Sequence, residues 1–228
     1  MRGNILIIGL GGIGGMLAEP LCRYLAYKTD LKEITLIDGD RYETKNILRQ
    51  RLSRDDVGRN KAEVWAQRIA SLFHELRVSA KGSYVSPENI KALIPDESTI
   101  MLCVDNHATR KLVQTHALGL KNVLLISGGN DYTDGNVQVF IKKRGRILSP
   151  AITAYHPEIA EPIDKRPDEL GCDEEVAEKP QLLFANMTAA CLMLNAFYGV
   201  LENKPHAGEV YFDILKNAAK PVTRKVKA

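Results

Sequence analysis

Glycine residues crowd a short segment near the start of the chain, where Gly9-Leu10-Gly11-Gly12-Ile13-Gly14 fits the spacing G-x-G-x-x-G. Glycines let the backbone turn tightly and approach a phosphate group, which the positive end of a following helix dipole would favour. Asp38 ends the next apolar run, where a carboxylate can accept hydrogen bonds from ribose hydroxyls. These residues predict a nucleotide site, and taken alone they favour NAD at least as strongly as ATP.

Charged and amide side chains recur in three later segments. These are Ile37–Asp40 with Asn46–Gln50, then Val57–Lys61, and then Asp105–Arg110. Arg49 offers a planar fork of donors and Lys61 a compact positive charge, and both suit phosphate oxygens. Asp105 follows an apolar run predicted to be a central strand, so it would face the crevice where open α/β sheets bind ligands. Ordinary solvated side chains, or a helix N-cap at Asp105-Asn106, would give the same residue types.

Together with the glycine loop, these segments resemble the ThiF/MoeB superfamily, which includes the catalytic domains of ubiquitin-activating enzymes. Two weaker similarities, at Gly128-Gly129 and at Val210–Asp213, extend the resemblance over most of the chain, with the poorest fit over residues 149–180. The resemblance implies that the protein binds Mg-ATP and adenylates the C-terminal carboxylate of a small ubiquitin-like or sulfur-carrier protein ending in Gly-Gly. It also implies a homodimer, and a following transfer of the acyl group to a thiol.

The resemblance also assigns roles to individual residues. Asp38 would hold the ribose, and Asp105 would help to hold Mg²⁺ at the triphosphate. Arg49 and Lys61 would grip the phosphates, because fixed cations and a metal ion aimed at developing charge lower the barrier to attack on a polyphosphate. The other expected members of the pocket are Gly9, Gly11, Gly12, Gly14, Asp40, Asn46 and Gln50.

The cysteines depart from the pattern of many relatives, which hold a structural zinc ion with two C-x-x-C pairs. No such pair occurs among Cys22, Cys103, Cys172 and Cys191, so we expect no structural zinc. Cys172 lies in a polar stretch where relatives often place a thioester-forming or persulfide-forming cysteine. It is a candidate nucleophile, although the acidic residues beside it disfavour the thiolate. The other three lie in apolar surroundings and are expected in the core.

Many relatives also send an arginine from an N-terminal helix into the ATP site of the neighbouring subunit. The first predicted strand begins almost at Met1, so this arginine has no obvious source in the sequence. Arg2, Arg51 and Arg54 are the basic residues expected to substitute for it. Without a substitute, adenylation would be slow or lost.

Strands and helices are predicted to alternate along the first half of the chain. Apolar runs predict buried strands at Asn4–Ile8, Ile34–Ile37, Thr99–Val104 and Val123–Ser127, and amphipathic spacing predicts a helix at Lys61–Phe73. This order is typical of an α/β fold, a Rossmann-like, doubly wound and mostly parallel sheet, here with antiparallel strands added at the C-terminal end. Residues 1–148 would form the nucleotide-binding half, residues 149–180 a crossover loop, and residues 181–228 the C-terminal helix and strand of the same domain.

The composition, with 45% hydrophobic and 26% charged residues, predicts a globular protein with a folded core. The net charge of +3 is too small to make nucleic acid or an anionic membrane the expected partner. No apolar run is expected to span a membrane, and the helix at Gln181–Leu201 is expected to be buried because it is apolar nearly all round. The cytoplasm is the expected location, since no disulfide framework is needed.

Three other functions compete with adenylation of a protein carboxylate. An NAD-dependent oxidoreductase would explain the glycine loop and Asp38, but it leaves the cluster from Asn46 to Lys61 unexplained and lacks an evident proton-transfer residue. A catalytically degenerate module would bind nucleotide or a ubiquitin-like protein without turnover. ATP activation of a non-protein carboxylate, including one on a modified tRNA, is the third, although the small net charge disfavours RNA.

Overall fold

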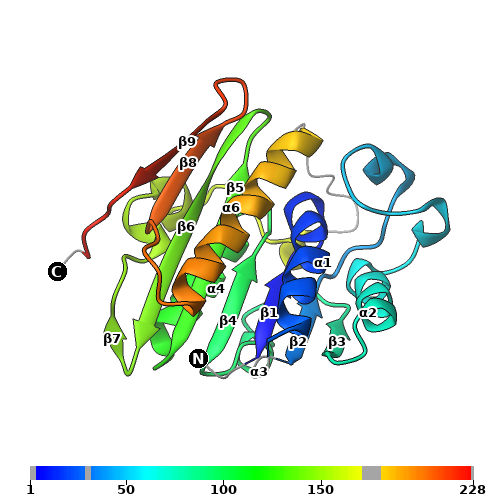
Figure 1. The fold of residues 1–228 in the computed structure, drawn as a ribbon, viewed down its shortest axis with the longest axis horizontal. Helices are drawn as coiled ribbons and strands as arrows, with labels where there is room; N and C mark the ends of the chain where they lie inside the picture. The colour runs from blue at the N-terminus through cyan, green and yellow to red at the C-terminus, as the bar shows by residue number, and fades with distance from the viewer. Residues whose placement is uncertain (1–3, 29–31, 171–180, 227–228) are drawn as a thin grey trace.

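One mixed sheet runs through the molecule (Figure 1). The computed structural model describes residues 4–28, 32–170 and 181–226, and within these ranges the sheet has nine strands. Its parallel neighbours are β3 (Arg77–Lys81), β2 (Glu33–Ile37), β1 (Ile5–Ile8), β4 (Ser98–Leu102) and β5 (Val123–Asn130). Antiparallel strands follow at β6 (Asp134–Lys143), β8 (Glu209–Asp213) and β9 (Ala218–Val222), and β7 (Arg146–Ile147) pairs with β6. The predicted fold class is confirmed.

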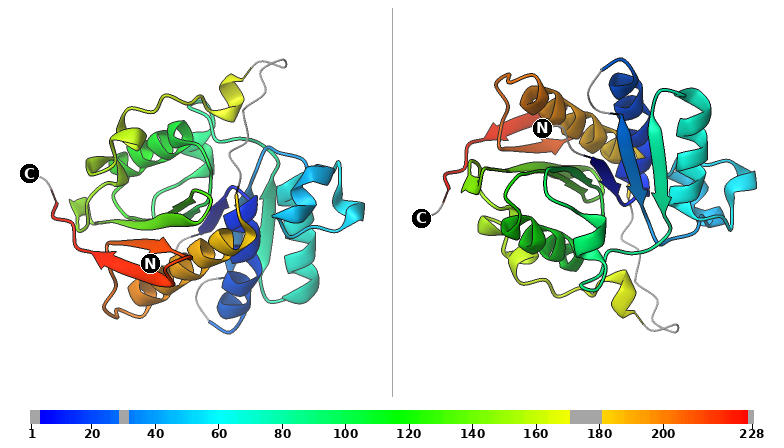
Figure 2. Two further views of the ribbon diagram at one scale, coloured as in Figure 1. Left: turned by 90° about the horizontal axis from the view of Figure 1, so that it is seen from above. Right: turned by 90° about the horizontal axis from the view of Figure 1, so that it is seen from below.

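Helices cover both faces of this sheet, as Figure 2 shows from two sides. One face carries α1 (Gly12–Ala26), α2 (Lys61–Leu72) and α6 (Leu183–Leu201), and the other carries α3 (Ile90–Leu93), α4 (His107–Gly119) and α5 (Pro157–Ala160). Short 3-10 helices lie in the described connections at Thr44–Leu48, Arg54–Asp56, Ile152–Ala154 and Pro167–Glu169. Parallel neighbours need long crossover connections, so the strand–helix alternation of the sequence leads to helical layers on the sheet.

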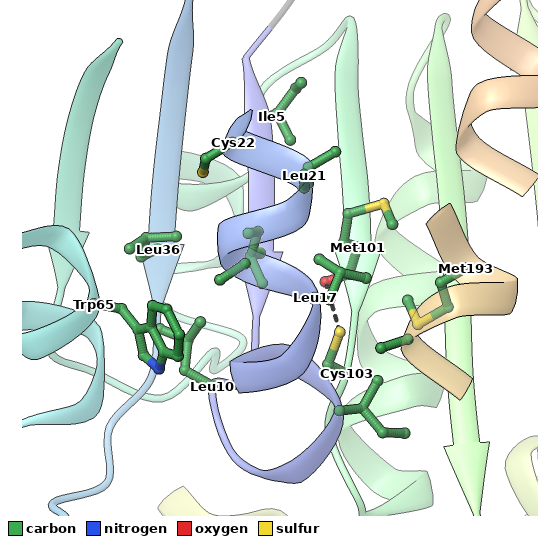
Figure 3. Close-up of a cluster of buried hydrophobic side chains, with 14 of the residues drawn as sticks. Ile5, Leu10, Leu17, Leu21, Cys22, Leu36, Trp65, Met101, Cys103 and Met193 are labelled. Atoms are coloured by element: carbon green, nitrogen blue, oxygen red, sulfur yellow. Dashed lines mark hydrogen bonds between the residues drawn. The ribbon is translucent and has the colours of Figure 1, made fainter. Parts of the chain in front are cut away.

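The two faces of the sheet bury separate apolar clusters. Ile5 and Ile7 of β1 face the layer of α1, whereas Leu6 and Ile8 face the layer of α4, because successive side chains of a strand point to opposite sides. Figure 3 shows the first cluster, in which Trp65 of α2 lies beside α1. Burial on both sides explains why the strands are continuous apolar runs, and each fully buried Leu or Ile side chain stabilises the fold by about 1.5–3 kcal/mol.

Helix α6 is buried on one side only, so the expectation of burial all round is wrong. Met193 and its neighbours on one face pack against α1 and the sheet. On the other face Phe184, Met187 and Tyr198 are 63%, 49% and 49% exposed, and Cys191 is exposed too, against the prediction that it lies in the core. By length and composition alone this 19-residue helix could cross a membrane, contrary to expectation, but core helices of soluble proteins pass the same test.

The carboxyl ends of β1, β2 and β4 meet at one edge of the sheet, and α1, α4 and α6 all begin at this edge. Helices α1 and α6 run in the same direction, since Gly12 lies against Asn186 near their starts and Tyr24 packs against Phe197 near their ends. The first N–H groups of a helix have no partner within the helix and carry its positive dipole end. The start of α1, which has no side-chain cap, is therefore suited to an anionic ligand.

Candidate active site

The glycine loop makes a turn that requires glycine at two positions. Gly9 has a φ of +86°, in the left-handed region, and its N–H donates to the carbonyl oxygen of Ile37 at 2.9 Å. A methyl group on Gly14 would lie only 1.9 Å from the carbonyl oxygen of Gly9. Gly11 is the N-cap of α1 and offers no side-chain acceptor, so no cap from that residue competes for the first N–H groups of the helix.

Asp38 and Asp40 are fixed beside this loop. The buried Asp38 carboxylate accepts the N–H of Leu10 at 2.6 Å and the N–H of Asp40 at 2.8 Å. Burial raises the pKa of Asp38 to about 6, more than the nearby charge of Lys61 lowers it. Tyr84 donates its hydroxyl to Asp40, and its ring packs on the glycine between the two aspartates, where a methyl group would meet it at 2.6 Å.

Lys61 forms an ion pair with Asp40, with 2.8 Å between Nζ and Oδ2. Burial alone would raise the pKa of Asp40. The charge and hydrogen bond of Lys61, together with the hydrogen bond from Tyr84 and the charge of Lys45, outweigh burial and hold that pKa below its usual value. Asn60 fixes the pair, because its Nδ2 donates to the carbonyl oxygens of Asp38 at 2.9 Å and Asp40 at 3.1 Å. Lys61 is only 6% exposed, so its positive charge is held in place.

Asn60 and Tyr84 belong to this site, and sequence reasoning missed both as functional residues. Asn60 carried a readable signal, since it stands directly before the predicted helix at the N-cap position, where its Oδ1 accepts the N–H of Glu63 at 3.2 Å. Tyr84 carried no such signal, because it lies 44 residues from its partner Asp40. Only the packing of the loop after β3 onto the end of β2 brings the two together.

Gln50 lies against the glycine loop, and Asn46 and Arg49 precede Gln50 in the sequence. Asn46 is buried, and its Oδ1 accepts the backbone N–H three positions earlier at 3.0 Å, which is a local cap. Gln50 is 7% exposed, its Nε2 is 3.6 Å from the position of a methyl group on Gly11, and its Oε1 has no partner among the described residues. Arg49 donates through Nη1 to Oε1 of Gln181 at 2.9 Å, which links this segment to the approach to α6.

Asp105 follows β4, is exposed, and makes no hydrogen bond or ion pair with any residue that the structure describes. Asn106 caps α4 by accepting the N–H of Thr109 at 2.7 Å, so the capping alternative holds for the asparagine and leaves the Asp105 carboxylate available. Behind it, the buried Arg110 donates to the carbonyl oxygen of Val104, just after β4, at 2.8 Å and to that of Gly128 in β5 at 2.9 Å. Arg110 thereby fixes the strand end from which Asp105 projects.

The crossover segment reaches this edge through Asp164, which accepts the N–H groups of His107 at 2.7 Å and Ala108 at 2.9 Å at the start of α4. Cys172, the predicted nucleophile, lies outside the described residues. In the part of the chain that the structure describes, no group of three or more His, Cys, Asp and Glu side chains could hold a metal ion. The absence of a structural zinc stays a prediction.

Arg51, one of the expected substitutes for the relatives' arginine, is engaged within its own chain. Its Nη1 lies 2.6 Å from a carboxylate oxygen of Glu19 in α1, and its guanidinium lies over the ring of Trp65. Arg2 lies outside the described residues. The buried positions of Cys22 and Cys103 confirm the prediction that both are core residues, and burial raises the pKa of each thiol to about 12.

The fold and the site together define an α/β protein of the Rossmann-like class, with a glycine loop, acidic groups and a fixed lysine collected at the carboxyl edge of a mostly parallel sheet. The ThiF family matches residues 2–225, and the chain belongs to this family. The resemblance seen in the sequence is thereby confirmed.

Curated relatives match parts of the chain. The tRNA threonylcarbamoyladenosine dehydratase of Escherichia coli is 41% identical over 88 residues, which are 38% of this chain and 31% of that protein. The sulfur carrier protein adenylyltransferase of Thermus thermophilus is 31% identical over 140 residues, 61% of this chain and 49% of that protein. The chain thus spans about a third to a half of these two relatives.

Solved structures share the fold over nearly the whole chain. The structure of E. coli MccB with ATP has a TM-score of 0.71 at 19% identity, covering 96% of this chain and 63% of MccB. The structure of PaaA has a TM-score of 0.70 at 20% identity, covering 97% of this chain and 64% of PaaA. At this level of identity the likeness shows the fold alone.

Proposed function

We propose that this protein binds Mg-ATP and adenylates a carboxylate, with release of pyrophosphate. The observation that carries the proposal is the ion pair of Lys61 with Asp40 beside the glycine loop, in a chain of the ThiF family. A lysine already fixed by Asp40 presents its charge to phosphate oxygens without reorganisation during the reaction, which is how preorganised groups stabilise a transition state. An NAD-dependent oxidoreductase gives this buried cation no role.

In this proposal the other residues of the site contact different parts of the nucleotide. Asp38 accepts ribose hydroxyls, since each of its oxygens has lone-pair capacity beyond the N–H bond that it already accepts. The glycine loop and Lys61 contact the phosphates, and Arg49 joins them from the segment beside Gln50. Asn46 supports that segment through its local cap.

Asp105 fits a magnesium site. Mg²⁺ in nucleotide sites is held by one or two carboxylates together with phosphate oxygens and water. Asp105 offers an exposed carboxylate that forms no hydrogen bond or ion pair with a described residue, just after a central strand. When bound, Mg²⁺ supplies Lewis-acid stabilisation of the charge on the phosphates.

The proposed substrate is the C-terminal carboxylate of a small ubiquitin-like or sulfur-carrier protein that ends in Gly-Gly. Support comes from relatives named as adenylyltransferases of sulfur-carrier proteins and from the MccB structure solved with its MccA peptide. A second candidate is a carboxylate on a modified nucleoside, which the 41% identity to the tRNA threonylcarbamoyladenosine dehydratase favours. Acyl transfer to Cys172 is proposed as a later step.

Exchange of labelled pyrophosphate into ATP tests the activity and separates the substrates. The assay compares a ubiquitin-like protein ending in Gly-Gly with tRNA carrying threonylcarbamoyladenosine, and calorimetric titration compares Mg-ATP with NADH. Exchange that is stimulated by the protein carboxylate and about 100-fold slower in Asp105→Ala is the expected result. Binding of NADH, or an ATP affinity indifferent to magnesium and to Asp105, would refute the proposal.

Two further expectations belong with this proposal. We infer that two copies pair, because the exposed face of α6 presents the apolar side chains Phe184, Met187 and Tyr198. Sedimentation equilibrium of the purified chain should give twice its mass of 25.3 kDa, and a monomer at micromolar concentration would contradict the inference. A cytoplasmic location fits the free thiols of Cys22 and Cys103, and fractionation of source cells would test it.

A further inference from the structure

Asn186, in the first turns of α6, is a buried amide without a partner. None of its side chain is exposed, and neither Oδ1 nor Nδ2 makes a hydrogen bond within the part of the chain that the structure describes. Buried amides almost always find partners, because leaving one unpaired is destabilising. Packing in an apolar core does not require an amide. A ligand that hydrogen-bonds to the polar atoms of Asn186 would explain why this residue is an asparagine.

The position of Asn186 supplies that reason. A methyl group on Gly12 would lie 2.3 Å from Nδ2 and 2.8 Å from Oδ1 of Asn186, so the amide touches the first residue of α1 in the glycine loop. Helices α1 and α6 both begin at this edge, and neither has a side-chain cap. The amide therefore lies where two uncapped helix starts meet.

Gln50 provides a second, independent amide at the same loop. It approaches the neighbouring Gly11 with its Nε2 3.6 Å from a methyl position, and its Oε1 has no partner among the described residues. Gln50 precedes α2 and Asn186 follows the crossover segment, so unrelated parts of the chain place amide side chains at the successive glycines Gly11 and Gly12. In each amide the atom nearest its glycine is the nitrogen, Nε2 of Gln50 and Nδ2 of Asn186, so both side chains present N–H donors toward the loop.

We propose that Asn186 binds the nucleotide phosphate seated on the glycine loop, with Nδ2 donating a hydrogen bond to a phosphate oxygen beside Gly12. The inference rests on the proposed function, because it assigns a further residue to the same site. A neutral amide suits this place, since it adds a donor close to the reacting phosphate without adding charge to that of Lys61.

The test replaces Asn186 with leucine, which has a similar size and no hydrogen-bonding atoms. Removing an unpaired buried amide should leave the melting temperature unchanged or higher, while the Kd for Mg-ATP should rise about 10-fold or more, as expected for one hydrogen bond to a charged group. The Kd for adenosine, which has no phosphate, should not change. If leucine does not fit at this position, Asn186→Ala should show the same change in the Kd for Mg-ATP. Asn195→Leu, on the exposed face of the same helix, is the matched control.

The possible results separate this inference from the proposed function. Wild-type binding of Mg-ATP with unchanged binding by Asn186→Leu overturns the inference alone, and shows that the amide is satisfied by water or tolerated unpaired. A lower melting temperature together with weaker adenosine binding assigns Asn186 a structural role and also overturns it. Wild-type protein that fails to bind Mg-ATP refutes the proposed function, and this inference with it.

Discussion

Replacing Lys61 with methionine should destabilise the fold in a manner that depends on pH. The Lys61 side chain is 7% exposed and that of Asp40 is 47% exposed, so the ion pair is half screened. Exposed pairs contribute about 0–1 kcal/mol, whereas breaking a buried pair costs about 3–5 kcal/mol. We therefore expect a loss of about 2 kcal/mol in the free energy of unfolding at pH 8.

The pH dependence follows from the two aspartates that Lys61 faces. In the wild type the lowered pKa of Asp40 contributes stability above the unfolded value of about 3.8, and this is lost as the pH falls through the folded pKa. Without Lys61 the pKa values of Asp40 and Asp38 both rise, the latter already being about 6. Their charged forms then destabilise the variant at high pH, and protonation relieves this as the pH falls. The difference from wild type should shrink to about 1 kcal/mol or less at pH 5.

Urea unfolding of both proteins at pH 8 and pH 5 measures this difference. Lys81→Met, at an exposed position that ends β3, is the matched control and should stay within about 0.5 kcal/mol of wild type. A loss for Lys61→Met that is the same at both pH values, or no loss at pH 8, would show that the ion pair with Asp40 does not hold this edge together.

Three more predictions concern the edge of the sheet. Asp105→Ala should lower the rate of pyrophosphate exchange about 100-fold, with an unchanged urea midpoint because its exposed carboxylate bonds no described residue; a shifted midpoint would contradict this. Gly14→Ala should abolish nucleotide binding in calorimetry, since its methyl group would lie 1.9 Å from the oxygen of Gly9, whereas Gly119→Ala, with nothing within 4 Å, should bind normally. Asp164→Ala should lower the free energy of unfolding in urea by about 1 kcal/mol, because the carboxylate that accepts the N–H groups of His107 and Ala108 is lost. An unchanged stability would show that Asp164 does not stabilise the start of α4.

The elements of the fold were predictable because their signals are local. Continuous apolar runs such as Ile5–Ile8 predict strands buried on both faces, and the glycines at the end of that run predict the turn that the positive φ of Gly9 confirms. The burial of α6 was predicted poorly, since composition shows how apolar a helix is and not how many of its faces find a partner. Cys191 was misplaced for the same reason.

The sequence by itself determined the alternation of strands and helices in the first half of the chain, the glycine loop and the presence of Asp38, Lys61 and Asp105 at strand and helix ends, because each depends on neighbours along the chain. Only the tertiary structure decided that Lys61 pairs with Asp40, that Tyr84 packs between the two aspartates, and that Asn186 meets the glycine loop. These contacts join residues tens to more than a hundred positions apart. The way the crossover connections pack on the sheet decides which residues meet, and no local sequence pattern specifies that packing.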